Sequence, residues 1–255
     1  MAELVFLGTG GGRHVLISQE RATAGFRIAG SRTVHVDPGP GYLQQCAKLA
    51  LDPAAPDVLL ISHCHIDHGN DANVAIEAMT GCGRRRRGAV FGENDSLFGA
   101  KEADRVISRY HQKMVARYRS LATGTSAAFL GVRVTATPAH HYGNCIGFIV
   151  ELDGARTGYS SDTVYFAGME KAFEGCDALV MNTIRPRGSS IPWHFGTDAA
   201  VKLLSALKRP PRLAVLQHFG RDMLSAGPKK EAAYVQRETG VKTVAATDGI
   251  RIGVP

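Results

Sequence analysis

The sequence lacks any segment suited to a membrane or to secretion. It begins M-A-E-L-V-F-L-G, without a basic region or the apolar core of a signal peptide. No later apolar run approaches the roughly 18 residues that cross a bilayer. We therefore expect a cytoplasmic protein without a membrane partner.

Cysteine is scarce and its spacing is irregular. The five cysteines are odd in number and form no C-x-x-C pair. This excludes a disulfide framework and a thiolate zinc knuckle, and it predicts reduced thiols. The residues are Cys46, Cys64, Cys82, Cys145 and Cys176.

The chain also lacks linkers and low-complexity segments. Its hydrophobic fraction of 44% and charged fraction of 21% are typical of a soluble globular protein, so we predict a single domain over residues 1–255. The formal net charge of +7 favours an anionic partner, either a small molecule or a nucleic acid.

The densest chemical signal lies within Ile61–Asp71, where I-S-H-C-H-I-D-H-G-N-D follows a short apolar run. Imidazole and carboxylate groups are the ligands that suit zinc, iron and manganese. Because side chains alternate along an extended segment, His63 and His65 point the same way, whereas Cys64 is expected on the opposite face. Asp67 and His68 follow and can face a second ion. The motif predicts a metal site.

Further chemical groups follow predicted strands. Asp37 ends a strand over 33–36, and His140 and His141 follow a hairpin over 127–136. Asp162 follows a strand over 156–159, and His218 follows one over 213–216. His194 precedes a predicted helix over 197–207. Strands followed by helices occur in both halves, which favours two similar layers packed face to face.

Two local predictions concern the ends of elements. Gly8–Gly12 follows a predicted strand but lacks the Lys-Ser/Thr of a phosphate loop, and no clear helix opens after it, so we interpret it as a turn near the site. Asn70 or Asp71 is expected to cap a helix over 72–80.

A basic segment occupies about residues 84–119. Arg84–Arg87 is an unbroken run, and five basic residues then recur at a period of four beside an apolar set, which predicts one helix with a basic stripe. A solvated face, a phosphate contact, a substrate rim and a homodimer interface are the alternatives for this segment. The recurring residues are Lys101, Arg105, Arg109, Lys113 and Arg117, with Val106, Tyr110, Met114 and Tyr118.

The motif H-C-H-I-D-H at 63–68, together with the later residues, resembles the metallo-β-lactamase superfamily over nearly the whole chain. The run H-Y-G-N-C-I-G-F and His194 in W-H-F-G-T-D-A-A are similar to the ribonuclease Z and metal-dependent phosphodiesterase branch. The resemblance implies an α+β four-layer αββα sandwich, the metallo-β-lactamase fold, with a binuclear site at one edge.

The same resemblance implies the roles of individual residues. Two divalent ions, zinc first with manganese or iron as alternatives, would share a bridging hydroxide that attacks the substrate. Asp162 would bridge the ions, and Asp67 and His194 are the candidate catalytic residues. The first ion would be held by His63, His65 and His141, and the second by Asp67, His68 and His218.

Three functions remain open from the sequence. The first is a binuclear hydrolase, favoured as a phosphodiesterase because of the positive charge and His194. The second is a lactonase or thioesterase with promiscuous esterase activity. The third is a metal-bound nucleic-acid-binding module, which the complete ligand set disfavours. The chain has no long glycine-rich arm of the ribonuclease Z type, so a full role in tRNA processing is not expected.

Overall fold

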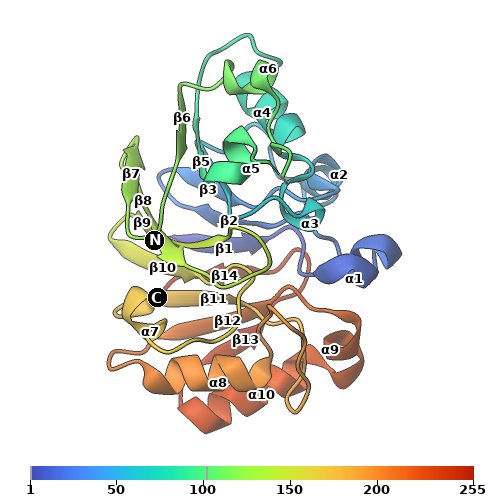
Figure 1. Ribbon diagram of the computed structural model, residues 1–255, viewed down its shortest axis with the longest axis vertical. Coiled ribbons are helices and arrows are strands. Elements are labelled where there is room, and N and C mark those ends of the chain that lie inside the picture. The colour runs from blue at the N-terminus through green and yellow to red at the C-terminus, as the bar shows by residue number, and fades with distance from the viewer. Residues whose placement is uncertain (1, 102) are drawn as a thin grey trace.

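Two mixed β-sheets pack face to face between outer helices (Figure 1). The computed structural model describes residues 2–101 and 103–255. This architecture confirms the predicted αββα sandwich. The single domain over 1–255 stays a prediction. Positions 1 and 102 lie outside the described residues, and position 102 belongs to the basic segment 84–119.

The first sheet has seven strands in the described residues, antiparallel from β14 to β3 and parallel from β3 to β6. In order across the sheet they are β14 (Arg251–Gly253), β1 (Glu3–Phe6), β2 (Phe26–Ala29), β3 (Thr33–Val36), β4 (Val58–Ile61), β5 (Ala89–Gly92) and β6 (Arg117–Ser120).

The second sheet also has seven strands within the described part of the chain, parallel from β13 to β10 and antiparallel from β10 to β7. In order they are β13 (Thr243–Ala245), β12 (Leu213–Gln217), β11 (Ala178–Asn182), β10 (Ala155–Tyr159), β9 (Ile146–Leu152), β8 (Val132–Pro138) and β7 (Ser126–Phe129).

The central parallel strands β4, β5, β11 and β12 are buried on both faces, and their sequences are mostly apolar. In β4, Val58 and Leu60 join the core between the sheets, whereas Leu59 and Ile61 pack under the outer helices. This alternation follows from the two-residue period of a strand. A helix layer on each side is therefore required.

Most helices cover the two outer faces, whereas the first helix of the chain projects at one edge of the sandwich (Figure 1). Those in the first half are α1 (Gly12–Ser18), α2 (Tyr42–Lys48), α3 (Ile66–Gly69), α4 (Ala72–Thr80), α5 (Asn94–Phe98) and α6 (Arg109–Gln112). Those in the second half are α7 (Glu170–Phe173), α8 (Thr197–Ala206), α9 (Arg221–Ala226) and α10 (Pro228–Thr239). None of the described helices is both long and apolar enough to cross a membrane.

The predicted basic helix is wrong. Among its described residues, only Arg109–Gln112 is helical, and Arg117–Ser120 pairs instead with β5 as the edge strand β6. Pairing with a neighbouring strand overrides the period of four. The apolar members Val106, Met114 and Tyr118 still pack on the core under α4, but they reach it from different elements.

The four arginines of the run have different surroundings, since two bond to the fold, whereas the side chains of the other two are exposed and form no such bonds within the described residues. Arg87 donates to the carbonyls of Ala54 and Pro56 and to Asp57, and Arg86 donates to the carbonyl of Val115. Arg84 and Arg85 are exposed. Half of the run therefore stabilises the fold, which a purely solvated run would not do.

Two predictions at element ends are also corrected. A helix, α1, does open after the glycine loop, and Gln19 ends it in a left-handed conformation with φ 52°. The Asp71 side chain does not cap its own helix; it accepts from the backbone N–H groups of Gly41 and Tyr42 at the start of α2. Asp71 therefore ties the two helices together.

Candidate metal centre

The candidate site residues gather at the carboxyl ends of strands from both sheets. Asp37 directly follows β3, and His218 directly follows β12. Both adopt left-handed backbone conformations, with φ of 52° and 61°, as does Ser161 after β10 with 55°. Such conformations are costly for residues other than glycine and concentrate at functional sites. Each turns the chain sharply at the same edge of the sandwich.

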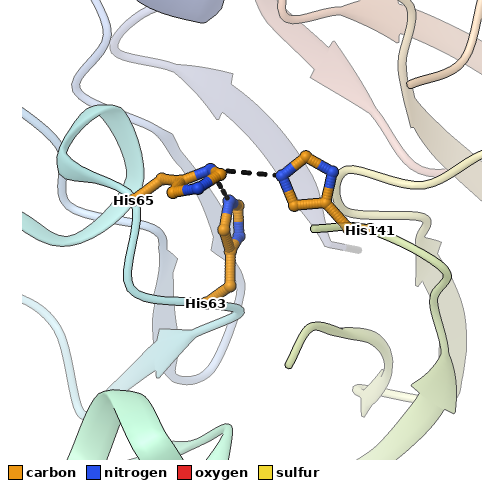
Figure 2. Close-up of side chains that lie close together, drawn as sticks. All are labelled: His63, His65 and His141. Atoms are coloured by element: carbon orange, nitrogen blue, oxygen red, sulfur yellow. Dashed lines mark hydrogen bonds between the residues drawn. The ribbon is translucent and has the colours of Figure 1, made fainter. Parts of the chain in front are cut away.

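The first group comprises His63, His65 and His141 (Figure 2). His63 Nε2 lies 3.0 Å from His65 Nδ1, and His141 Nε2 lies 3.1 Å from the same atom. Nitrogen ligands about 2.0–2.1 Å from a tetrahedral zinc ion lie roughly 3.4 Å apart, so the three rings fit one ion. His140 does not join them, because its ring stacks on Phe166 at 3.8 Å.

The second group comprises Asp67, His68 and His218. His68 Nε2 lies 3.1 Å from His218 Nε2, which lies 3.3 Å from Asp67 Oδ2. Asp67 and His68 belong to the short helix α3, which turns the motif back toward the sheet edge. These donors also suit a divalent ion.

Asp162 lies between the two groups. Its Oδ2 is 3.5 Å from His68 Nε2 and 4.0 Å from His141 Nε2, and its Oδ1 is 3.5 Å from His218 Nε2. His194 Nε2 approaches Oδ2 at 3.4 Å. The structure therefore brings all eight predicted site residues together.

Burial and charge prepare these groups as ligands. Burial, together with the charge of His68, holds the pKa of His63 well below its ordinary value. Burial lowers the pKa of His141 to about 4. Although burial alone would raise the pKa of Asp162, His218 and His68 hold it well below its usual range. Although burial alone would lower the pKa of His68, Asp162 and Asp67 raise it well above its ordinary value, so this ring would release a proton when a metal binds. The neutral imidazoles of His63 and His141 beside the Asp162 carboxylate are donors that suit a divalent metal.

A buried hydrogen-bond network supports the ligands from behind. Asp37 Oδ2 lies 2.9 Å from His68 Nδ1 and accepts from Ser62 Oγ at 2.7 Å and Tyr159 Oη at 2.8 Å. Asn182 Nδ2 donates to Asp162 Oδ1 at 2.7 Å and to Tyr159 Oη at 3.1 Å. Partners of this kind fix the orientation of metal ligands. Ser62, Tyr159 and Asn182 were not predicted from the sequence.

The glycine loop serves the same purpose. The backbone N–H of Gly12 donates to Asp67 Oδ2 at 2.9 Å. A Cβ atom on Gly11 would lie 2.2 Å from the ring of His218, so only glycine lets the imidazole pack here. The loop lies near the site, as predicted, and positions two candidate ligands of the second group.

A cleft of about 930 Å³ opens onto the centre. Its lining combines Arg13, Arg185 and Arg221 with Asp67, Asp162 and several apolar side chains. Cys64 is also among the lining residues, but it belongs to none of the candidate ligand groups found in the described residues.

The chain is similar to known proteins along its whole length. It is 34% identical over 254 residues to an uncharacterized protein of Methanocaldococcus jannaschii, covering 98% of this chain and 94% of the relative. It is 27% identical over 218 residues to a metal-dependent hydrolase of Thermoplasma volcanium, covering 80% and 83%.

Three solved structures share the fold. A metallo-beta-lactamase fold protein from Bacillus subtilis has a TM-score of 0.77 at 15% identity, covering 98% of both chains. A diphosphatase from the PhnP family has a TM-score of 0.70 at 16% identity, covering 100% of this chain and 98% of the other. The short form of human tRNase Z has a TM-score of 0.70 at 17% identity, covering 99% of both.

Fold, site and relatives together define the class: a metal-dependent hydrolase of the metallo-β-lactamase fold. The sequence profile described as "Beta-lactamase superfamily domain" matches residues 32–219. The chain belongs to the beta-lactamase superfamily, which confirms the resemblance drawn from its histidine motif.

Proposed function

We propose that the protein is a phosphodiesterase with two zinc ions. The observation that carries the proposal is the position of Asp162 between two groups of three ligands each. His63, His65 and His141 would hold the first ion, and Asp67, His68 and His218 the second. Two such ions would supply an activated water and neutralise charge on the attacking and leaving oxygens.

The chain's own residues would then manage protons. Although burial lowers the pKa of His194, the hydrogen bond to Asp162 and its charge raise it above the ordinary value. A protonated His194 would donate from Nε2 to the leaving oxygen. Asp67, which the N–H of Gly12 holds at Oδ2, lines the cleft. Although burial would raise its pKa, His68 and His218 hold that pKa far below its usual range, so Asp67 would stay an anion and orient the attacking water by accepting a hydrogen bond.

A phosphate ester is favoured over other substrates by charge. Three arginines line the cleft, and the chain carries a net charge of +7. The similar folds of a diphosphatase and a tRNase Z agree with this choice. The apolar part of the cleft lining favours a second candidate, a lactonase or thioesterase, because acyl groups are apolar.

One experiment separates these candidates. Metals per chain are counted by elemental analysis, and kcat/KM is compared for bis(p-nitrophenyl) phosphate, a lactone and a thioester in one buffer with zinc or manganese. We expect two metals and a preference for the phosphodiester, with turnover lost in Asp162→Ala and Asp67→Ala. A preference for the lactone or thioester would replace the proposal by the second candidate, and fewer than one metal per chain would reject the binuclear site.

A further inference from the structure

The helix α1 forms one side of the cleft and is unusually apolar for a projecting element. It extends from the body of the molecule beside α3 (Figure 1), and Val15 is its buried side chain. Arg13 and Ile17 are four residues apart, so they lie on the same side of the helix, and both line the cleft. Ile17 is 81% exposed.

Other exposed apolar side chains line the same cleft. Ile66 in α3 is 60% exposed, and Trp193, in the loop that carries His194, is 49% exposed. Contiguous exposed apolar groups that border a cleft mark binding sites, whereas isolated ones are ordinary. We define the apolar wall as Leu16, Ile17, Ile66, Ile191 and Trp193, all of which line the cleft.

The cations of the cleft are engaged differently. Arg185 forms an ion pair with Asp222, and Arg221 lies 3.3 Å from His14 and 3.7 Å from Asp222. Arg13 forms no ion pair within residues 2–101 and 103–255. Arg13 can therefore meet a ligand anion, while Ile17, about 6 Å further along the helix axis, can meet an adjoining apolar group.

We propose that the substrate is an amphiphilic phosphodiester with an alkyl or aryl ester group that binds the apolar wall. This inference rests on the proposed phosphodiesterase function and adds the class of ester group. The phosphate lies at the metal centre near Arg13, and the apolar group covers Ile17, Ile66 and Trp193. A nucleoside fits less well, because its sugar and base need hydrogen-bond partners, and the side chains of the wall offer one donor, the Trp193 indole N–H.

Binding can be measured without catalysis. Trp193 is the only tryptophan in the sequence, so its emission reports contact with the wall. The metal-loaded protein is titrated by calorimetry with methylphosphonate and hexylphosphonate, and its emission is recorded at saturation. We expect hexylphosphonate to bind about tenfold more tightly or better, because its chain leaves water, and to shift the emission to shorter wavelength.

Variants assign the effect to residues. Ile17→Gln should reduce the hexyl preference to about twofold, whereas Ile17→Leu should keep it. Arg13→Gln should weaken both phosphonates by a similar factor and leave their ratio unchanged. Leu43→Gln is the matched control, because Leu43 is an exposed leucine of α2 outside the cleft; it should alter neither affinity.

Each outcome decides the inference. Equal affinities for the two phosphonates, or tighter binding of thymidine 5′-monophosphate than of hexylphosphonate, would overturn it. An oligomer that dissociates in Ile17→Gln while phosphonate affinities stay unchanged would make the wall a contact between two copies, again overturning it. If methyl and hexyl p-nitrophenyl phosphate are not hydrolysed but the hexyl preference persists, the phosphodiesterase proposal fails while the apolar subsite stands.

Discussion

Because Gly11 has no side chain, the His218 imidazole can reach the candidate metal centre. A Cβ there would lie 2.2 Å from the imidazole, although the extended backbone of Gly11 suits any residue. Gly11→Ala should therefore displace His218 and cost about one of the two ions per chain that we propose. Elemental analysis after dialysis measures this loss.

Gly253→Ala provides the control for that variant, because no atom of the described residues lies within 4 Å of the added Cβ. It should keep the metal content of the parent protein. Unchanged metal content in Gly11→Ala would mean that His218 is no ligand or that its loop adjusts freely.

His35 gives the fold a pH dependence separate from the metal centre. It is fully buried in β3, its Nε2 lies 3.0 Å from the carbonyl of Ala24, and burial together with the charge of Arg27 holds its pKa well below the ordinary value. The folded state keeps it neutral, whereas the unfolded chain takes up a proton below about pH 6.5. Stability is therefore lost as pH falls below about 6.5, by at most about 1.4 kcal/mol per pH unit from this residue.

Replacing His35 should flatten this dependence. Thermal unfolding of the parent and His35→Gln is compared from pH 8 to pH 5; glutamine can donate to Ala24 but takes up no proton. We expect the free energy of unfolding of the parent protein to fall more steeply than that of His35→Gln as pH decreases. Parallel profiles would show that His35 accepts a proton inside the fold.

At the scale of elements, the hydrogen bonds between β3, β10 and β11 connect the two sheets directly behind the ligands. Tyr159 Oη joins Asp37 to Asn182. Tyr159→Phe should cost about 1–2 kcal/mol of stability and lower metal affinity roughly tenfold, because His68 and Asp162 lose oriented partners. Chemical denaturation and competition with a metal chelator measure the two effects.

Tyr118→Phe separates the two effects. In the parent protein the Tyr118 hydroxyl, on the edge strand β6 and away from the ligands, donates to the carbonyl of Leu97 at 2.7 Å. This variant should lose similar stability and keep its metal affinity. Equal losses of affinity in both variants would contradict an orienting role for Tyr159.

The sequence revealed those elements that local patterns determine. The motif at 63–68 encodes four neighbouring groups. The dipeptide Asp153–Gly154, which joins β9 to β10, is likewise a local hairpin signal, because a two-residue turn needs the left-handed conformations that both residues adopt. The bond between Tyr159 and Asp37 joins positions 122 apart, and no local pattern specifies it. The prediction of one helix in the basic segment was wrong for a similar reason, because the pairing of β6 with β5 depends on the assembled sheet.

At the scale of the whole molecule, the candidate ligands come from both halves of the sandwich. His63, His65, Asp67 and His68 follow β4 of the first sheet, whereas His141, Asp162 and His218 follow strands of the second. Bound ions would therefore fasten one half to the other. Ions at about a thousandfold above their Kd would add roughly 4 kcal/mol to the free energy of unfolding.

Metal removal tests this coupling. Calorimetry before and after dialysis against a chelator should show a lower Tm for the stripped protein, and added zinc should restore it. Asp162→Ala should respond much less to the same treatment. An identical Tm with and without metal in the parent protein would exclude any contribution of the ions to folding.

The pairing of β14 with β1 has a consequence for the order of the chain. Val254 donates its backbone N–H to the carbonyl of Ala2 at 2.8 Å, so the two ends of the described fold are neighbours. Because these ends lie so close together, a circular permutation of the chain should keep the packing of the two sheets. A permuted gene would join these ends and open the exposed turn at Gly124, which connects β6 of the first sheet to β7 of the second. The ribosome would then make the second half before the first, and the folded chain would have the same catalytic edge.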